Sequence, residues 1–456
     1  MKKASVKIGL EIHSYLITKE KLFCNCKASR HLTKQNIPPN TNICPICTGQ
    51  PGCKPMLPNS EAIKKSIAIA LMLNCKISDK KIIWQRKHYD WPDLPKGYQI
   101  TQSGSYSIPL AEKGKFENIR IRELHLEEDP AAWNPETGTI DYNRSCLPLV
   151  EIVTEPDFAF VEEVIEWLKN FILTMSYIKT IDKNAGIKAD VNISINNGER
   201  VEIKNISSLE NIKKAIEYEI LRQQKEKVKR ETRRFDESTG KTTLMRTKEQ
   251  AEDYRFIPDP DLPITKISKK EIEDIKKSLP ESPKEKLNKL IKKYKIDKIN
   301  SEVLARNLEI VEFFEQVANK IDGKFALPWI TTELLRVLNY NKKTLDEVNI
   351  NPQHFIELLE LVKSKQITEL KAKQILNEFV PNSFSPKSKL DKFQKISNEE
   401  IEKICKEVIK ENKKAISDYK TGELRALSFL IGEVMKKSNR RADFKSSKII
   451  LEKLIQ

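Results

Sequence analysis

The stretch Val6-Lys-Ile-Gly-Leu-Glu-Ile-His13 alternates apolar residues with polar or small ones. A period of two is typical of a β-strand that buries one face and leaves the other outside the core. We therefore expect a strand whose apolar side chains enter a core, while Glu11 and His13 project side by side from the opposite face.

The same alternation recurs in later stretches and predicts a β-rich region that extends to about Thr265. These stretches are Leu124–Asp129, Leu147–Pro156, Ala189–Ile195 and Val201–Asn205. The polar groups on their outward faces are His125, Glu127 and Asp129 in the first stretch, Glu151 and Glu155 in the second, and Asp190 and Glu202 in the last two.

Carboxylates that converge from separate strands suit Mg²⁺, because this ion takes oxygen ligands and bridges to substrate phosphates. The alternative is an antiparallel sheet with one solvated face, where outward polar residues are ordinary. Acids are poor strand formers, and their repeated use favours the metal-site interpretation. A basic loop from Arg86 to Tyr98 contains Lys87 and Lys96, which we expect to reach phosphate oxygens.

The cysteines predict a second kind of metal site. Cys24 and Cys26 form a Cys-x-Cys pair, and Cys44 and Cys47 form a Cys-x-x-Cys pair. Together they offer four thiolates for the tetrahedral shell of a structural Zn²⁺ site, a zinc knuckle. The alternative is four packed or solvent-facing thiols, and Cys53 is a competing ligand.

Helical periodicity replaces the strand pattern after the proline-rich segment Pro258–Pro263, which neither a helix nor a central strand accommodates. A second break, Pro381–Ser388, is typical of a linker. After it, Ser397 and Glu400 predict a capping box, and three apolar stripes predict a small bundle of three helices.

The expected fold class is α+β, in three domains. The first, over residues 1–295, is a large cradle domain with a mixed, mainly antiparallel β-sheet and the zinc knuckle. A helical middle domain follows over residues 296–396, and a small helical tail domain occupies residues 397–456.

The chain of 456 residues carries 81 Lys and Arg against 65 Asp and Glu, a formal net charge of +16. This excess attracts phosphate backbones and favours a nucleic-acid partner, whereas a general Lys bias gives the same charge without any dedicated binding face. No apolar stretch approaches the roughly 20 residues that span a bilayer. No secretory signal is evident either, so we expect no membrane segment and a cytoplasmic protein with reduced cysteines.

Several ordered motifs resemble those of the GatB family, the B subunits of glutamyl/aspartyl-tRNA amidotransferases. The matching passages are Gly9–His13, Pro39–Cys47, Arg86–Lys87, Pro92–Gln99, His125–Asp129, Asp141–Asp157, Val201–Asn205, Tyr254–Pro263, and in the tail Asp418–Gly422 and Gly432–Lys437. So many motifs in one order are more specific than any one of them.

The resemblance implies a ligase that acts on Glu-tRNA(Gln), Asp-tRNA(Asn) or both. Family members use ATP and Mg²⁺ to phosphorylate the side-chain carboxylate of the esterified amino acid, and ammonia then displaces phosphate. The ammonia comes from a separate amidase (A) subunit, and a small C subunit completes the heterotrimer.

Carried over residue by residue, the resemblance also implies site residues. The catalytic candidates are Glu11, His13, Lys87, Glu128 and Glu151, and the Mg²⁺ candidates are Glu11, His13, Glu127, Glu128, Glu151 and Asp190. Strand alternation puts Glu127 rather than Glu128 beside His125, so both stay candidates. The zinc ligands match Cys24, Cys26, Cys44 and Cys47; the phosphate or ATP candidates are Lys87, Lys96 and Lys204; the tRNA candidates are Lys436, Lys437, Arg440 and Arg441.

The chain departs from the family pattern at two places, and there are three rival interpretations, of which one is a purely structural subunit that the acids on the strand faces argue against. Asp129 is followed by Pro130 and Ala131, where most members have a small residue and Gly, and Arg441–Phe444 lacks a Pro that often follows the Asp. Another rival is the related E subunit of a Glu-specific enzyme, which has a large inserted domain. The last is a zinc-containing RNA-binding protein without catalysis, which would not place acids near RNA phosphates.

Overall fold

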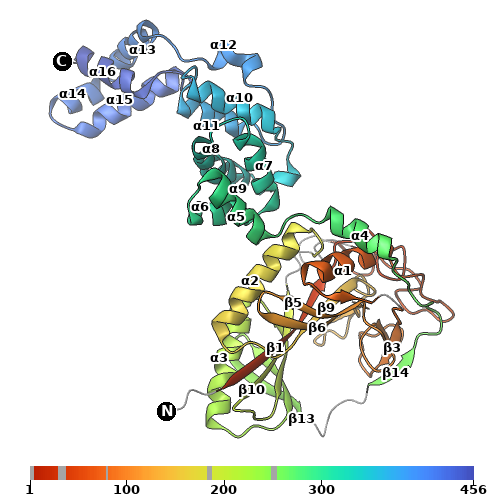
Figure 1. Ribbon diagram of the computed structural model, residues 1–456. Coiled ribbons are helices and arrows are strands. Elements are labelled where there is room, and N and C mark those ends of the chain that lie inside the picture. Colours follow the sequence, from red (N-terminus) through yellow and green to blue (C-terminus); the bar gives the residue numbers. More distant parts are fainter. Residues whose placement is uncertain (1–4, 29–36, 79–80, 182–186, 248–253, 456) are drawn as a thin grey trace. The chain divides into compact units, whose positions relative to one another are not determined.

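The computed structural model describes residues 5–28, 37–78, 81–181, 187–247 and 254–455. The chain forms two compact units, Met1–Ser282 and Pro283–Gln456, which run from red to green and from green to blue in Figure 1. The break at Ser282 precedes the domain limit predicted after residue 295, and each unit has its own hydrophobic core.

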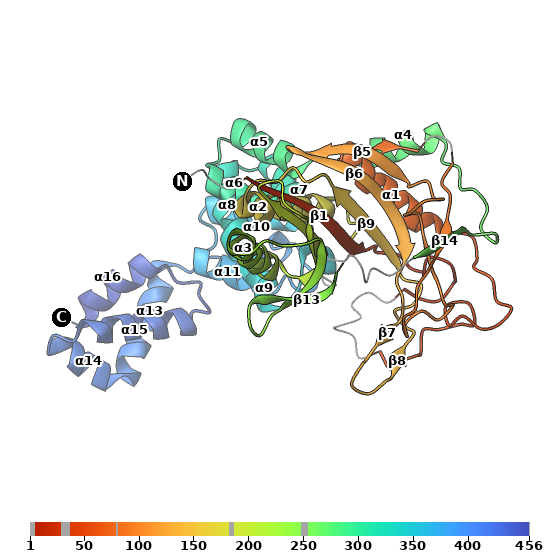
Figure 2. The same ribbon diagram turned by 90° about the horizontal axis from the view of Figure 1, so that it is seen from below.

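A sheet of 12 strands organises the described part of the first unit, with the main order β13-β12-β11-β10-β1-β9-β6-β4-β3-β14. Among the described residues every pairing in it is antiparallel except β11 with β12, which confirms the predicted fold class. The strands are β1 (Val6–Tyr15), β2 (Lys76–Ile77), β3 (Gln85–His88), β4 (Gln99–Thr101), β5 (Ala111–Phe116), β6 (Ile119–Glu128), β9 (Pro148–Thr154), β10 (Lys188–Ile195), β11 (Val201–Ser207), β12 (Glu231–Asp236), β13 (Lys241–Thr247) and β14 (Arg255–Pro258). A separate hairpin of β7 (Ala132–Trp133) and β8 (Ile140–Asp141) extends away from this sheet in Figure 2.

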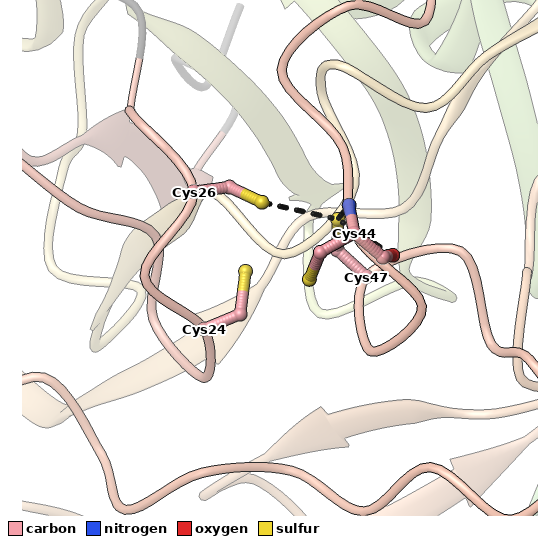
Figure 3. Close-up of side chains that lie close together, drawn as sticks. All are labelled: Cys24, Cys26, Cys44 and Cys47. Atoms are coloured by element: carbon pink, nitrogen blue, oxygen red, sulfur yellow. Dashed lines mark hydrogen bonds between the residues drawn. The ribbon is translucent and has the colours of Figure 1, made fainter.

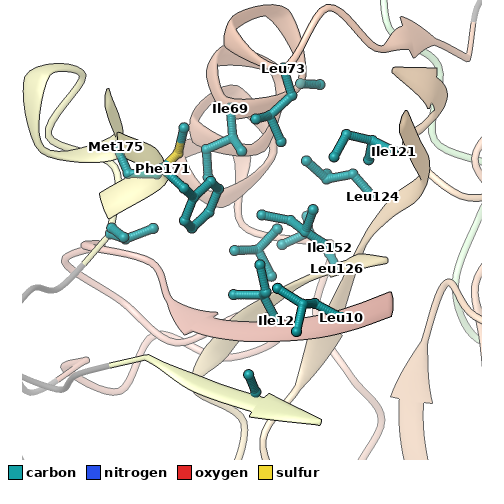
Figure 4. Close-up of a cluster of buried hydrophobic side chains, with 14 of the residues drawn as sticks. Leu10, Ile12, Ile69, Leu73, Ile121, Leu124, Leu126, Ile152, Phe171 and Met175 are labelled. Atoms are coloured by element: carbon teal, nitrogen blue, oxygen red, sulfur yellow. The ribbon is translucent and has the colours of Figure 1, made fainter. Parts of the chain in front are cut away.

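One face of the sheet forms the core with three helices, α1 (Ser60–Met72), α2 (Val161–Tyr177) and α3 (Leu209–Lys225). In Figure 4, strand residues such as Leu10 and Ile152 face Ile69 of α1 and Phe171 of α2. All four of these side chains are at most 1% exposed. Because strand side chains alternate between faces, burying this face sends the intervening polar residues to the other one.

Side-chain caps mark the start of two of the three covering helices, α1 and α3. The Asn59 side chain accepts hydrogen bonds from the backbone N–H groups of Glu61 and Ala62 at the start of α1. The Ser208 side chain accepts one from the Asn211 N–H at the start of α3. These caps satisfy amide groups that have no partner inside the helix. A further helix of this unit, α4 (Lys269–Ser278), is capped in the same way by Ser268.

The second unit is helical and holds two separate apolar clusters in its described residues. One extends from Leu290 to Phe393 and the other from Ile396 to Ile455. The elements around the first cluster are α5 (Pro283–Tyr294), α6 (Lys298–Ala305), α7 (Leu308–Ala318), α8 (Gly323–Pro328), η2 (Trp329–Leu334), α9 (Leu335–Tyr340), η3 (Leu345–Glu347), α10 (Pro352–Lys363), α11 (Glu369–Asn377), η4 (Lys387–Lys389) and α12 (Leu390–Phe393).

The tail consists of α13 (Asn398–Glu411), α14 (Lys413–Lys420), α15 (Leu424–Lys437) and α16 (Phe444–Ile455). The capping box of Ser397 and Glu400 is confirmed, since each side chain accepts a hydrogen bond from the other residue's N–H. The apolar stripes predict only three of these helices, because α14 contributes no more than a few partly buried residues to the core. Within the described residues no helix of the chain has the length and apolar character to cross a membrane.

Candidate functional site

The polar face of the sheet brings imidazole and carboxylate groups together on adjacent strands. In the strand register, His13 of β1 and His125 of β6 both lie opposite Glu151 of β9. Glu151 Oε2 is 3.4 Å from His13 Nε2 and 3.0 Å from His125 Nε2, and Glu11 Oε1 is 3.6 Å from His13 Nε2. The shared face predicted from alternation therefore produces direct contacts.

This face holds three overlapping groups of three residues, and within each group the ligand atoms lie within 4.8 Å of one another. We call their seven members the acid cluster: Glu11, His13, His125, Glu127, Glu151, Asp190 and Glu202. Glu11 of β1 is directly opposite Asp190 of β10, which connects the histidine-containing groups to Asp190 and Glu202. Carboxylates that converge from separate strands match what a Mg²⁺ site requires.

The electrostatics of the cluster show a shortage of positive charge. Burial and the neighbouring Glu151 raise the pKa of Glu11 to about 8, and the same two causes raise the pKa of Glu127. Burial opposes protonation of His13, but Glu151 and nearby acids outweigh it and raise its pKa to about 10. Burial would raise the pKa of Glu151, yet the two histidines hold it well below its usual value. A divalent cation bound here would supply the positive charge that these carboxylates lack.

His125 gives a separate indication that the site accommodates a ligand. Its side chain is fully buried, and neither ring nitrogen makes a hydrogen bond of regular geometry, although Nε2 lies 3.0 Å from Glu151. Buried polar atoms in folded proteins nearly always have partners. The unpartnered Nδ1, together with an Nε2 that faces crowded carboxylates, fits the donor set of a metal site.

A lysine neutralises part of the negative charge of the acid cluster at Asp190 and Glu202. Lys204 Nζ is 2.5 Å from Asp190 Oδ2 and 2.9 Å from Glu202 Oε1. Burial disfavours its charged form, but these two carboxylates outweigh that effect and raise the pKa of Lys204. The ammonium therefore lies between two members of the cluster, on the same face as the metal candidates.

Lys87 lies on the same polar face, beyond Glu127. It pairs with Gln99 of β4, and Thr101 of that strand lies opposite Glu127. Its Nζ is 4.5 Å from the ring centroid of Tyr254. An ammonium over an aromatic face is attracted by the ring, so the ring of Tyr254 favours this position of the Lys87 side chain.

Glu128 and Lys96 do not join the acid cluster. Glu128 follows Glu127 on a strand, so it points to the other face of the sheet. There its carboxylate lies 2.5 Å from Lys96 Nζ and accepts a hydrogen bond from the Ile100 N–H at 2.9 Å. Both side chains are less than 10% exposed. The structure thus brings Glu127, and not Glu128, to the metal candidates, and Lys96 pairs with Glu128 away from them.

Four residues near the end of β1 form a network, and of these only Tyr15 lies outside the sequence passages named above. Tyr15 Oη donates to Asp129 Oδ2 at 2.5 Å, and Arg144 Nε lies 3.2 Å from the same oxygen. Arg144 is also 3.7 Å from Asp93. These residues come from four separate chain segments, so their spacing in sequence gives no signal. His125 and Glu202 also belong to the passages named above, and their strand parity is the signal that places them on the polar face.

The four cysteines lie close together, on two loops that face each other in Figure 3. Their sulfur atoms are all within 4.8 Å of one another, and Cys47 Sγ is 4.0 Å from Cys26 Sγ. Burial raises the pKa of Cys26 to about 12, so without a cation this thiol keeps its proton. Four sulfurs in one shell fit a tetrahedral Zn²⁺ or similar soft metal. Cys53 is exposed and lies outside this group.

The tail candidates differ in how strongly the fold engages their charges. Lys437 Nζ lies 2.6 Å from Glu411 and 3.3 Å from Glu407, and Arg441 Nε donates to the Gln394 carbonyl. Lys436 has a side chain that is 79% exposed. Arg440 is exposed and has a φ of 61° just after α15. Among the four tail candidates, Lys436 and Arg440 are therefore the most available to a partner, although Lys436 Nζ lies 3.9 Å from Glu433 Oε1.

Comparison with known proteins agrees with this geometry. Models of the GatB/GatE catalytic domain and of the GatB domain match residues 6–273 and 312–455, respectively. The B subunit of the aspartyl/glutamyl-tRNA(Asn/Gln) amidotransferase of Methanothermobacter thermautotrophicus is 42% identical over 446 residues, which cover 96% of this chain and 97% of that protein. The corresponding B subunits of Methanopyrus kandleri and of Methanococcus maripaludis strain C5 are also 42% identical, over 453 and 471 residues that cover 96% and 99% of this chain and 96% and 98% of theirs.

Domain matches that together extend over most of the chain, and relatives aligned along nearly its whole length, leave one assignment. The chain belongs to the GatB family, the B subunits of aspartyl/glutamyl-tRNA(Asn/Gln) amidotransferases.

Proposed function

We propose that this chain carries the site at which the side-chain carboxylate of Glu on tRNA(Gln), of Asp on tRNA(Asn), or of both, is phosphorylated by ATP and then amidated. The observation that carries the proposal is the acid cluster, where Glu11 and Glu151 each lie within 3.6 Å of His13 Nε2 on a largely buried polar sheet face. Such a cluster is costly to fold and is ordinarily retained for function.

In this proposal Glu11, His13, Glu127, Glu151 and Asp190 hold Mg²⁺. When bound, Mg²⁺ neutralises the phosphate oxygens of ATP and of the phosphoryl group in transfer. The substrate carboxylate oxygen attacks the γ-phosphorus, ADP leaves, and an acyl phosphate forms. Ammonia then attacks the carbonyl carbon, inorganic phosphate leaves, and the nitrogen loses a proton to give the amide.

The lysines of the polar face supply fixed positive charge for the same step. Lys87 stabilises charge on the phosphoryl group, because it lies on the cluster's side of the sheet and is not engaged by any carboxylate within ion-pair distance in the described residues. Lys204 binds phosphate at the other end, beside Asp190 and Glu202. Since Lys96 and Glu128 satisfy each other on the opposite face, we assign that pair to holding the loop in place.

The four cysteines hold a structural Zn²⁺ in this proposal, and the ion supplies folding energy rather than chemistry. Their thiols are free in the structure, which suits a reducing cytoplasm. The relatives are named as one lettered subunit of an amidotransferase, which implies a multi-subunit enzyme. We therefore propose an amidase A subunit as the ammonia source, a small C subunit that completes the heterotrimer, and tRNA binding through the tail residues Lys436, Lys437, Arg440 and Arg441.

Two alternatives are weaker. A zinc-containing RNA-binding subunit without catalysis leaves the acid cluster unexplained, because buried carboxylates repel phosphates and cost stability. An E-type subunit is disfavoured because the relatives reported above are B subunits and cover nearly the whole chain.

The experiment is co-expression with candidate A and C subunits, followed by an assay of ATP-, Mg²⁺- and glutamine-dependent conversion of Glu-tRNA(Gln) and Asp-tRNA(Asn). Amide product on either tRNA supports the proposal and gives the substrate preference. Tight binding of aminoacyl-tRNA without any product would overturn it in favour of the non-catalytic RNA-binding protein.

A further inference from the structure

Lys21 is a buried lysine beside the four cysteines, and its residue is only 1% exposed. Its ammonium donates to Cys47 Sγ at 3.5 Å and to the Tyr142 carbonyl oxygen at 3.2 Å. Lysines are almost never fully buried unless an anionic group pairs with them. The partner that compensates this charge is therefore informative.

No carboxylate lies within 4.0 Å of Lys21 Nζ in the part of the chain that the structure describes. A buried ammonium that faces only a thiol and a carbonyl would remain uncompensated. Four thiolates around a divalent metal carry a net charge of −2, that is, four charges of −1 and one of +2. Such a centre gives Lys21 the anion that its other neighbours do not provide.

We propose that Lys21 is the charge-compensating partner of a divalent metal–tetrathiolate centre formed by Cys24, Cys26, Cys44 and Cys47. Its ammonium donates to the Cys47 thiolate and reduces the net charge of the centre from −2 to −1. This inference rests on the proposed Zn²⁺ occupancy of the four cysteines.

The Cys47 sulfur accepts two hydrogen bonds from the surrounding structure. In addition to the bond from Lys21, its sulfur accepts from the Cys44 N–H at 3.2 Å. Hydrogen bonds to a ligating sulfur withdraw charge from it and hold its orientation, which lowers its tendency to leave the metal. Loss of Lys21 removes the charged one of these two donors.

The same ammonium connects the centre to the sheet. Tyr142 begins a short segment that ends at Cys146, just before β9. Ser145 Oγ in that segment donates to the Cys47 carbonyl at 2.6 Å, and Cys146 Sγ accepts from the Phe23 N–H at 3.3 Å. Lys21 thus makes one of several hydrogen bonds that attach the two cysteine loops to the segment Tyr142–Cys146, which leads into β9, the strand that carries Glu151.

The test compares Lys21→Met with Lys27→Met in the full-length protein. Methionine keeps much of the buried apolar stem without the charge, and Lys27 is an exposed lysine adjacent to Cys26. Zinc content and the rate of zinc transfer to a colorimetric chelator are measured for both. We expect Lys21→Met to weaken zinc retention by about 10- to 100-fold, as for other residues that support metal ligands, and Lys27→Met to match the wild type.

Co²⁺ substitution gives a spectroscopic readout that a purely structural role would not change. Removal of the hydrogen bond leaves the Cys47 sulfur richer in electrons, so we expect the thiolate-to-Co²⁺ charge-transfer bands of Lys21→Met to move to longer wavelength. Unchanged bands together with wild-type zinc retention would overturn the inference. A wild-type protein that binds neither zinc nor cobalt would instead overturn the proposed metal site itself.

If Lys21→Met does not fold, the wild-type protein still provides a test through labelling with an amine-reactive ester and mass spectrometry. We expect Lys21 to resist labelling in zinc-loaded protein while Lys27 reacts, and to react once a chelator has removed the zinc. Labelling of Lys21 in the zinc-loaded protein at the rate of Lys27 would refute the contact with the centre.

Discussion

Gly49, in the loop that follows Cys47, lies directly against Pro95: a Cβ built on Gly49 would come within 2.2 Å of the Pro95 carbonyl oxygen. Gly49 also has a φ of +67°, a backbone conformation that favours glycine. Pro95 precedes Lys96, the partner of Glu128. The loop that contains Cys44, Cys47 and Gly49 and the loop that contains Pro95 and Lys96 therefore fit together only without a side chain at position 49.

The first prediction follows from this contact. Gly49→Ala should destabilise the protein by about 2 kcal/mol or more, because it adds backbone strain and a steric clash. Gly52→Ala is the matched control, since Gly52 has a φ of +82° but nothing within 4 Å of an added Cβ. Thermal unfolding of both variants isolates the clash. Equal losses of stability would show that the packing against Pro95 contributes nothing.

The second prediction concerns the acids that contact His13. Glu11→Gln or Glu151→Gln should reduce ATP-dependent amidation by about 100-fold or more, because each removes a charge from the proposed metal and phosphoryl-transfer site. Binding of aminoacyl-tRNA to the assembled complex should stay within a factor of a few, because neither residue lies in the tail. Near wild-type turnover in either variant would contradict the assignment of the site.

The third prediction separates Glu127 from its neighbour Glu128. Glu127→Gln should raise the Mg²⁺ concentration needed for half-maximal activity and leave stability unchanged or improved, because its carboxylate is crowded by Glu151. Glu128→Gln should destabilise the fold by about 3 to 5 kcal/mol, because it leaves the Lys96 ammonium buried without its partner. Mg²⁺ titration of activity and denaturant unfolding together check both. A reversed pattern would return Glu128 to the metal site.

Strand alternation predicts most of the polar face of the sheet. Residues with the same parity on β1, β6 and β9 share a face once the apolar residues are buried, and this places Glu11, His13 and Glu127 together. The family resemblance alone puts Glu128 in the catalytic set, and parity is the better guide to its position. The contact of His125 with Glu151 depends on strand register, which alternation does not specify.

Other parts of the site are not predictable for identifiable reasons. Lys21 lies in the charged run Lys19-Glu-Lys21, a pattern typical of an exposed loop, yet it is buried by contacts with segments far away in sequence. The pairing of Lys204 with Asp190 depends on an irregularity in the register between β10 and β11 near Asp190. Both are tertiary contacts, and local sequence has no information about them.

The fourth prediction is a pH dependence in the second unit. Glu333 Oε1 lies 2.8 Å from Lys373 Nζ, and its Oε2 lies 3.0 Å from Arg336 Nε. Burial would raise the pKa of Glu333, but these two cations outweigh it and hold the pKa below the ordinary value of 4.5. A carboxyl whose pKa is lower in the folded state stabilises the protein at pH values above its unfolded-state pKa. This stabilisation is lost as the pH falls through the folded-state pKa.

Glu333→Gln should therefore be less stable than the wild type at pH 6, and the difference should shrink below about pH 4.5. The readout is the unfolding temperature of each protein between pH 3 and pH 6. Lys373→Met offers an independent check, because it removes one of the two cations and should reduce the pH dependence over the same range. A stability difference that stays constant from pH 6 to pH 3 would refute a role for the Glu333 charge.

The last prediction tests the division of labour between the two apolar clusters of the second unit. The tail cluster begins at Ile396, and the preceding cluster ends at Phe393, so truncation after Lys395 removes one core and leaves the other intact. We expect the truncated chain to assemble with the A and C subunits but to bind tRNA more weakly, with a shallower dependence of affinity on salt, because it has lost Lys436 and Arg440. Pull-down of the complex and tRNA titration at several salt concentrations measure the two properties separately. Lys436→Ala in the full-length chain should also lower the affinity for tRNA, by a smaller factor than truncation does. Loss of assembly on truncation would instead place the contact with the other subunits, rather than the tRNA contact, in the tail.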